Sequence, residues 1–217
     1  MLKPDTQGRQ MFSLSGLLIR EAFLDALPAD KIAARRLLGL TPERITICLL
    51  YGGGGSWRMQ ELALALRQSN PAISDRIQLI FLCGHNNGLR ESLVQYSWTC
   101  PVLIEGFTRD VHRYLGSADI FVGKPGPGCV SEALACGLAL LLDRSTAMPQ
   151  ERSMLTWVRN EGLGLDFTSP RQFCDALETL CRVEAMAKLN PNRFRGPGSN
   201  QAVKQIPAVI DQILNQQ

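Results

Sequence analysis

The stretch ITICLLYGGGGSWRMQELALALRQ, residues 45–68, contains the pattern that decides the fold. It begins with a strand-sized run of β-branched and leucine residues, passes through four consecutive glycines, and continues with apolar residues at helical spacing. Similar strand-sized runs follow at 77–82, 101–106, 119–123, 138–143 and 163–167. Amphipathic segments of helix length separate them. This βαβα alternation predicts an α/β, Rossmann-like fold, in which helices cover both faces of a parallel sheet.

The helices expected between the strands span Trp57–Gln68, Leu89–Gln95, Asp110–Ser117, Val130–Cys136 and Glu151–Asn160. Before the sheet, residues 15–23 (SGLLIREAF) predict an extended piece, and Ala29–Leu38 predicts a helix that ends at Gly39. After it we expect helices over Pro170–Val183 and Ala202–Leu214, with a loop over Asn190–Asn200. The expected organisation is a linker and leading helix at 1–40 and a sheet domain at 41–217.

The composition of the whole chain excludes several classes of protein. A net charge of +3 over 217 residues is too small a bias to indicate nucleic-acid binding, although weak attraction to anionic lipid surfaces remains open. The seven cysteines are scattered without C-x-x-C pairs, which argues against a zinc site or a disulfide framework and favours a reducing compartment. No apolar run is long enough for a membrane span, and the N-terminus lacks the apolar core of a secretory signal.

In a sheet of this kind, ligands bind outside the carboxyl ends of the strands, so the loops after the strands carry the candidate site. Gly53, Gly54, Gly55 and Ser56 belong to the first such loop, YGGGGS (51–56), where bare backbone N–H groups suit a phosphate. A tight strand-to-helix turn explains the same glycines equally well. In CGHNN (83–87), Gly84 permits a turn, and His85 and Asn86 can donate hydrogen bonds toward the same crevice, although a lone loop histidine is often incidental.

Three later loops complete the candidate site. In EGFTRD (105–110), Phe107 is placed to flank a base and the backbone at Thr108 to read its edge, unless Phe107 belongs to the core. The rigid loop from Lys124 through Gly126, Pro127 and Gly128 leads into a helix start suited to a diphosphate, with Glu132 placed to accept hydrogen bonds from a ribose diol. The alternatives are that Glu132 only complements the helix dipole and that Lys124 is a surface charge. In AMPQERS (147–153), Gln150 and Glu151 can reach sugar hydroxyls, though Gln and Glu are also ordinary at a helix start.

Two stretches, GFTRDVHRYLGSADIFVGKPGPGCVSEALACGLALLL (106–142) and MPQERSMLTWVRNEGLG (148–164), resemble the C-terminal domain of glycosyltransferase family 28. Within that family they are most similar to monogalactosyldiacylglycerol synthases and diacylglycerol glucosyltransferases. The resemblance implies the C-terminal, donor-binding half of a GT-B glycosyltransferase. It further implies an inverting hexosyltransferase that uses UDP-galactose or UDP-glucose, needs no metal or other cofactor, and transfers the sugar to a lipid such as diacylglycerol in glycolipid synthesis.

The resemblance also implies roles for individual residues. The backbone at Thr108, after Phe107, would meet uracil, and Glu132 would hold the ribose. The other implied contacts are Gly126, Pro127, Gly128 and Cys129 with the diphosphate, Gln150 and Glu151 with the hexose, and Gly53–Ser56 and Gly84–Asn86 facing the donor. The sequence departs from the family at Leu18, where proline is usual, at His85, where Arg or Lys is common, at Cys129, where Thr is usual, and at Ala139, where Pro is frequent.

The family's N-terminal acceptor domain has no counterpart in these residues, so we expect the acceptor domain to be absent from this chain or supplied separately. The catalytic base stays unknown, because inversion requires one and neither His85 nor His112 is assigned to that role. The expected partners are a UDP-hexose, a lipid acceptor and a peripheral membrane contact, in the cytoplasm or, in a photosynthetic eukaryote, the plastid. The alternatives are a non-catalytic UDP-sugar-binding module or degenerate fragment and, less favoured, an epimerase of the same architecture.

Overall fold

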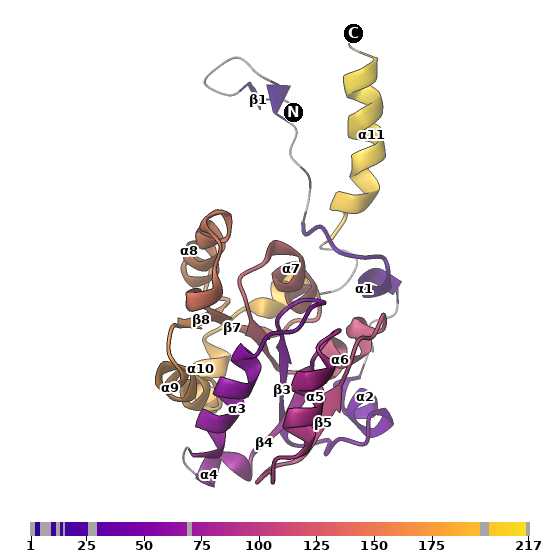
Figure 1. Ribbon diagram of the computed structural model, residues 1–217. Helices are drawn as coiled ribbons and strands as arrows, with labels where there is room; N and C mark the ends of the chain where they lie inside the picture. The colour runs from indigo at the N-terminus through magenta and orange to yellow at the C-terminus, as the bar shows by residue number, and fades with distance from the viewer. Residues whose placement is uncertain are drawn as a thin grey trace.

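The computed structural model describes residues 3–4, 10–11, 14, 16–25, 30–68, 71–195 and 200–215. Its centre is a six-stranded sheet in the order β5-β4-β3-β6-β7-β8, in which every neighbouring pair is parallel (Figure 1). The strands are β3 (Ile45–Leu50), β4 (Ile77–Leu82), β5 (Val102–Glu105), β6 (Ile120–Gly123), β7 (Ala139–Asp143) and β8 (Gly164–Phe167).

The strand order contains a topological switch point between β3 and β6. From β3 the chain builds outward through β4 to β5, then returns to pair β6 against the other side of β3, with Ile47 opposite Ile120. The loops after β3 and β6 therefore diverge to opposite faces of the sheet and leave a crevice between them. This order is that of a Rossmann-like sheet, so the predicted fold class is confirmed.

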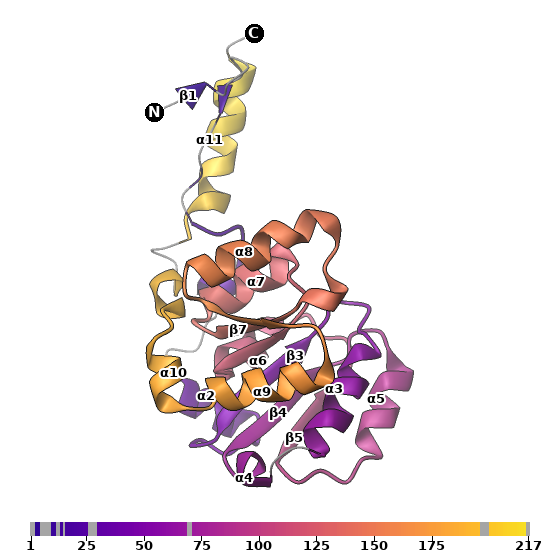
Figure 2. The same ribbon diagram turned by 90° about the vertical axis from the view of Figure 1, so that its left-hand side faces the viewer.

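Helices cover both faces of the sheet because neighbouring residues of each strand point to opposite sides. Ile47 and Leu49 belong to a core with α3 (Arg58–Arg67), α5 (Asn87–Val94) and α9 (Pro170–Leu180). Cys48 and Leu50 belong to a second core, on the other face. The helices of that face are α6 (Val111–Ser117), α7 (Pro127–Ala135) and α8 (Arg152–Asn160) (Figure 2). The short α4 (Pro71–Ser74) and α10 (Val183–Ala187) lie between larger elements.

The leading segment packs on the sheet domain. It contains α1 (Ala22–Asp25) and α2 (Lys31–Leu37), and Phe23 is buried in the second core. Arg35 is also buried, donating to the carbonyl oxygens of Ser117 and Pro42 and to Asp119. As predicted, α2 ends before Gly39, whose φ of +70° suits glycine. Farther toward the N-terminus, β1 (Lys3–Pro4) pairs antiparallel with β2 (Gln10–Met11).

Several predicted boundaries differ from those of the structure. Helix α7 begins at Pro127, three residues before the predicted start, because a proline in the first turn has a helical φ already set. The helix predicted to reach Val183 ends at Leu180, since Arg182 is extended and α10 begins anew. In 15–23, predicted to be extended, α1 begins at Ala22. The predicted loop at 190–200 contains the 3-10 turn η3 (Pro191–Phe194), and its residues 196–199 lie outside the described part.

The last helix, α11 (Ala202–Leu214), has the predicted bounds and projects away from the sheet domain (Figures 1 and 2). Across the described residues, none of the helices combines the length and the apolar character that a membrane span requires.

Candidate functional site

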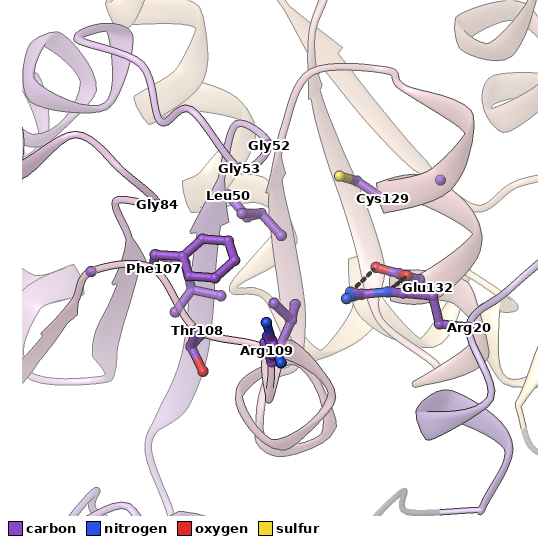
Figure 3. Close-up of a pocket in the computed structure, with 14 residues that line it drawn as sticks. Arg20, Leu50, Gly52, Gly53, Gly84, Phe107, Thr108, Arg109, Cys129 and Glu132 are labelled. Carbon is purple, nitrogen blue, oxygen red and sulfur yellow. Dashed lines mark hydrogen bonds and ion pairs between the residues drawn. The ribbon is translucent and has the colours of Figure 1, made fainter.

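A cavity of 330 Å³ opens at the carboxyl ends of the strands, beside the switch point (Figure 3). It lies among the loops after β3, β4 and β5, the first turns of α7 and the leading segment. The residues that line it are Arg20, Leu50, Gly52, Gly53, Leu82, Gly84, Gly106, Phe107, Thr108, Arg109, Val111, Gly128, Cys129 and Glu132. Loops distant in sequence therefore form one site, as expected for the carboxyl edge of a parallel sheet.

The loops after β3 and β4 fit together so closely that glycine is required. Gly84 has a φ of +61°, and a Cβ there would lie 2.2 Å from the carbonyl oxygen of Gly53. Gly55 has a φ of +64°, and its Cβ would lie 2.1 Å from the carbonyl oxygen of Cys83. The His85 N–H donates to the Gly53 carbonyl oxygen at 2.9 Å. The glycines thus permit contact between two backbones, which fixes the floor of the cavity.

Two polar side chains predicted to face the donor are used within their own loops. The Asn86 Oδ1 accepts from the Leu89 N–H at 2.9 Å and caps α5. The Ser56 Oγ accepts from the Arg58 N–H at 3.2 Å, at the start of α3. Neither residue is among those that line the cavity, and neither are Gly54, Gly55 or His85. Of the residues predicted on the loops after β3 and β4, the structure places Gly53 and Gly84 in the lining of the cavity and the other five outside it.

An exposed aromatic ring forms one side of the cavity. Phe107 is 54% exposed and its ring stacks on the exposed His85, with ring centroids 4.0 Å apart and planes 15° from parallel. The alternative that Phe107 belongs to the core is therefore wrong. Beside it, the Thr108 Oγ1 accepts from the Asp110 N–H at 3.0 Å, which holds the loop in place before α6.

The opposite side of the cavity carries an ion pair. The Glu132 side chain is 10% exposed and lies in the second turn of α7. Its Oε1 accepts from the Arg20 Nε at 2.5 Å and its Oε2 from the Arg20 Nη2 at 3.0 Å. This hydrogen bonding raises the pKa of Arg20 above its usual value, so the guanidinium stays charged. Glu132 therefore has a specific partner in addition to any effect of the helix dipole.

Cys129 lies near this ion pair, in the first turn of α7 (Figure 3). Burial raises the pKa of its thiol, and the negative charge of Glu132 raises it further. Arg20 also places its guanidinium 5.3 Å from the centre of the Phe23 ring, which belongs to the second core. The leading segment is thus held against both the core and the cavity.

The other residues predicted on the loops after β6 and β7 do not line the cavity. Lys124 places its Nζ 3.4 Å from the Glu151 Oε1, and the Glu151 Oε2 accepts from the Met148 N–H at 3.0 Å. Glu151 is only 3% exposed and lies beneath Gly126, where a Cβ would be 3.3 Å from its Oε1. Gln150 and Pro127 are exposed. A contact between Gln150 or Glu151 and a hexose therefore stays a prediction.

A buried carboxylate at the end of β7 connects several loops at the same edge of the sheet. Asp143, at the end of β7, is fully buried and accepts hydrogen bonds from the Tyr51 hydroxyl at 3.0 Å and the Arg58 Nε at 2.9 Å. Burial raises the pKa of Tyr51, so its hydroxyl keeps the proton that it donates. Arg58 also donates to the carbonyl oxygen of Thr168, after β8. The loops after three strands are thus tied together.

Sequence reasoning missed several cavity residues: Arg20, Leu50, Gly52, Leu82, Gly106, Arg109 and Val111. Gly52, Gly106 and Arg109 stood inside the quoted loops, so taking every residue of those loops as a candidate would have found them. Arg20 had no such signal, because it precedes the six-stranded sheet and lies 112 positions from Glu132 along the chain. Across the described residues, no group of three His, Cys, Asp or Glu side chains is placed to hold a metal ion.

Comparison with known proteins places these features in context. No protein-family model matches the chain. The chain is 33% identical over 160 residues to monogalactosyldiacylglycerol synthase 3, chloroplastic, of Arabidopsis thaliana. It is 32% identical over 163 residues to the probable monogalactosyldiacylglycerol synthase 2, chloroplastic, of Oryza sativa subsp. indica. Each match covers 72% of this chain and 34% of the relative, so the chain spans about a third of the length of these proteins.

Among solved structures, MurG of Acinetobacter baumannii matches with a TM-score of 0.66 and 14% identity, over 93% of this chain and 57% of that one. WaaG, a glycosyltransferase involved in lipopolysaccharide biosynthesis, matches with a TM-score of 0.61 and 16% identity, over 81% and 49%. At these identities the likeness concerns the fold. The resemblance to the C-terminal domain of glycosyltransferase family 28 is thereby confirmed: in sequence the chain is similar to the monogalactosyldiacylglycerol synthases, and it shares a Rossmann-like fold with solved GT-B glycosyltransferases.

Proposed function

We propose that this chain is the donor domain of an inverting lipid hexosyltransferase and binds a UDP-hexose in the cavity between Phe107 and Glu132. One observation carries the proposal: a single cavity at the switch point brings together an exposed aromatic ring, a largely buried carboxylate and the start of a helix. Its volume of 330 Å³ lies at the lower end of the range for small-molecule sites, about 300–1,000 Å³.

Each part of a nucleoside diphosphate has a matching surface in this cavity. The flat face of Phe107 suits a base, and the Glu132 carboxylate suits the two hydroxyls of a ribose. The first-turn N–H groups of α7, at Gly128 and Cys129, have no partners within the helix and suit a phosphate. Arg109 adds a positive charge to the lining. Such donors stabilise the negative charge that develops on a departing nucleoside diphosphate without a metal ion.

The Arg20–Glu132 ion pair sets a condition on ribose binding. Both carboxylate oxygens already accept hydrogen bonds from Arg20. A carboxylate has about four lone-pair positions, so a ribose diol either uses the remaining ones or displaces the guanidinium. In both cases Arg20 holds the Glu132 carboxylate in a fixed position before the ligand arrives.

The proposed acceptor is a lipid such as diacylglycerol, by analogy with the monogalactosyldiacylglycerol synthases, and the proposed compartment is the plastid that their names indicate. Transfer requires an acceptor domain and a base, which we expect outside the described residues. The alternative is a module that binds UDP-sugar without transfer.

Titration calorimetry with UDP, UDP-galactose and UDP-glucose tests the donor site. We expect UDP binding in the wild type and a loss of at least tenfold in affinity in Glu132→Ala, because a ribose diol loses a charged acceptor. A well-folded wild type that binds none of the three ligands would refute the proposal.

A transfer assay separates the enzyme from the binding module. Radiolabelled UDP-galactose or UDP-glucose is incubated with diacylglycerol vesicles and this chain, with and without the acceptor domain of a monogalactosyldiacylglycerol synthase. Glycolipid formed only when both are present supports a donor domain. UDP binding without transfer under either condition supports the binding module.

A further inference from the structure

Among the rings in the described part of the chain, only that of His85 lies flat against Phe107. Its centroid lies 4.0 Å from that of Phe107 and the two planes are 15° from parallel. Phe107 is otherwise an exposed side chain at the edge of the cavity, whereas His85 lies just outside the lining. In Figure 3 the Phe107 ring extends from the loop after β5 toward Leu50. One face of the phenyl ring is therefore covered and the other remains available to the cavity.

The position of His85 is fixed by its backbone. Its N–H donates to the Gly53 carbonyl oxygen at 2.9 Å, and the preceding Gly84 contacts the same peptide so closely that a Cβ would overlap it. On the other side, Asn86 caps α5. These contacts hold the backbone of His85 in place, and with it the position from which the imidazole extends. Phe107 lies on a different loop, which connects β5 to α6.

We propose that His85 is a positioning residue: it holds the Phe107 ring as a preformed platform on which the base of the donor nucleotide stacks. This inference rests on the proposed donor site. A solvent-exposed phenylalanine alone would sample several rotamers and lose that freedom on binding, which weakens affinity. With one face stacked on His85, the ring is already ordered, and the base adds a third layer on the other face. His85 thereby acts on a ligand that it does not touch.

The test compares two ligands that differ in the base. UDP contains the uracil, whereas ribose 5-diphosphate retains the ribose and diphosphate and lacks the base. The variants are His85→Ala, which removes the ring, His85→Phe, which keeps a flat ring, and His85→Leu, which keeps bulk without a flat ring. Asn87→Ala is the matched control, since Asn87 is an exposed residue two positions farther along.

We expect His85→Ala to weaken UDP binding roughly 3- to 10-fold, as the loss of one aromatic pair implies, and to change ribose 5-diphosphate binding less than about twofold. His85→Phe should restore UDP binding, while His85→Leu should not. Asn87→Ala should bind both ligands like the wild type.

Three results would overturn the inference: unchanged UDP affinity in His85→Ala, an equal loss for both ligands, or rescue by His85→Leu as complete as by His85→Phe. If His85→Ala fails to fold, the UDP affinities of His85→Phe and His85→Leu still test the inference. A wild type that does not bind UDP would instead refute the donor site itself, so the two failures are distinguishable.

Discussion

Replacing Gly84 with alanine should damage the protein far more than replacing Gly54, although both lie in loops at the same edge of the sheet. Gly84 has a φ of +61°, and an added Cβ would lie 2.2 Å from the Gly53 carbonyl oxygen and 2.7 Å from its carbonyl carbon. At Gly54 the same Cβ would meet nothing within 4 Å, and φ there is not positive. Gly54→Ala is therefore a matched control for the loss of a glycine.

The magnitude follows from two separable costs. Placing alanine in the left-handed region costs about 1–2 kcal/mol. The clash is with backbone, so the loops must separate, and the hydrogen bond from the His85 N–H to the Gly53 carbonyl oxygen is lost at about 0.5–1.5 kcal/mol. We therefore expect Gly84→Ala to lower the free energy of unfolding by about 1.5–3.5 kcal/mol. In a chain of this size the corresponding decrease in Tm is roughly 3–14 °C.

Urea denaturation followed by circular dichroism gives the free energy of unfolding of both variants. Calorimetric titration of the folded proteins gives their affinity for UDP. Gly54→Ala should remain within about 0.5 kcal/mol of the wild type. Gly84→Ala should also bind UDP more weakly, because the floor of the cavity has moved. If the two variants have the same free energy of unfolding, the close contact between the loops does not exist in solution and the reasoning fails.

Three further predictions concern the cavity and the packing beneath it. Glu132→Ala should reduce the preference for UDP over 2′-deoxy-UDP to less than about twofold in calorimetry, because the diol loses its acceptor; a preserved preference would place the ribose elsewhere. The raised pKa of Cys129 keeps its thiol protonated at neutral pH, so alkylation, followed by peptide mass spectrometry, should rise about tenfold per pH unit from 7 to 8.5, and saturating UDP should slow it. A rate that reaches a plateau below pH 8 would contradict the raised pKa. Arg35→Met should lower the free energy of unfolding by about 3–5 kcal/mol, because Asp119 and two carbonyl oxygens lose this partner. Arg36 is exposed, so Arg36→Met should lower it by less than about 0.5 kcal/mol. Similar values for both variants would show that the buried contacts of Arg35 do not contribute to stability.

The sheet was predictable from sequence because its strands are continuous apolar runs with clear ends. Strands β3 and β4 occupy the predicted residues, 45–50 and 77–82, since both are buried on two faces and bounded by turn-forming or polar residues. The start of α7 was not predicted, because helical periodicity cannot be recognised within a run of prolines and glycines. The edge of the sheet that carries the cavity followed from the βαβα alternation, because ligands of a parallel sheet bind at the carboxyl ends of its strands.

Side-chain partners were the part that sequence could not supply. The prediction placed Glu132 in the site, and it lines the cavity, yet its ion pair with Arg20 joins residues separated by 112 positions. Glu151 was predicted from its position on a loop, but its two carboxylate oxygens interact with Lys124 and with the Met148 N–H. A pattern along the chain gives the edge at which a side chain lies, whereas the atom that it contacts depends on packing of the whole domain.

The ion pair between Arg20 and Glu132 links the leading segment to the cavity, so a probe on that segment can detect a ligand that contacts Glu132. Leu18, two residues before Arg20, is 55% exposed, so a fluorophore attached to a cysteine at that position would face solvent. A ligand that takes hydrogen bonds from Glu132 changes the restraint on Arg20 and, through it, the environment of the dye. With the donor site that we propose, the labelled domain would serve as an optical sensor for nucleotide sugars, and it would need neither an acceptor lipid nor a completed transfer.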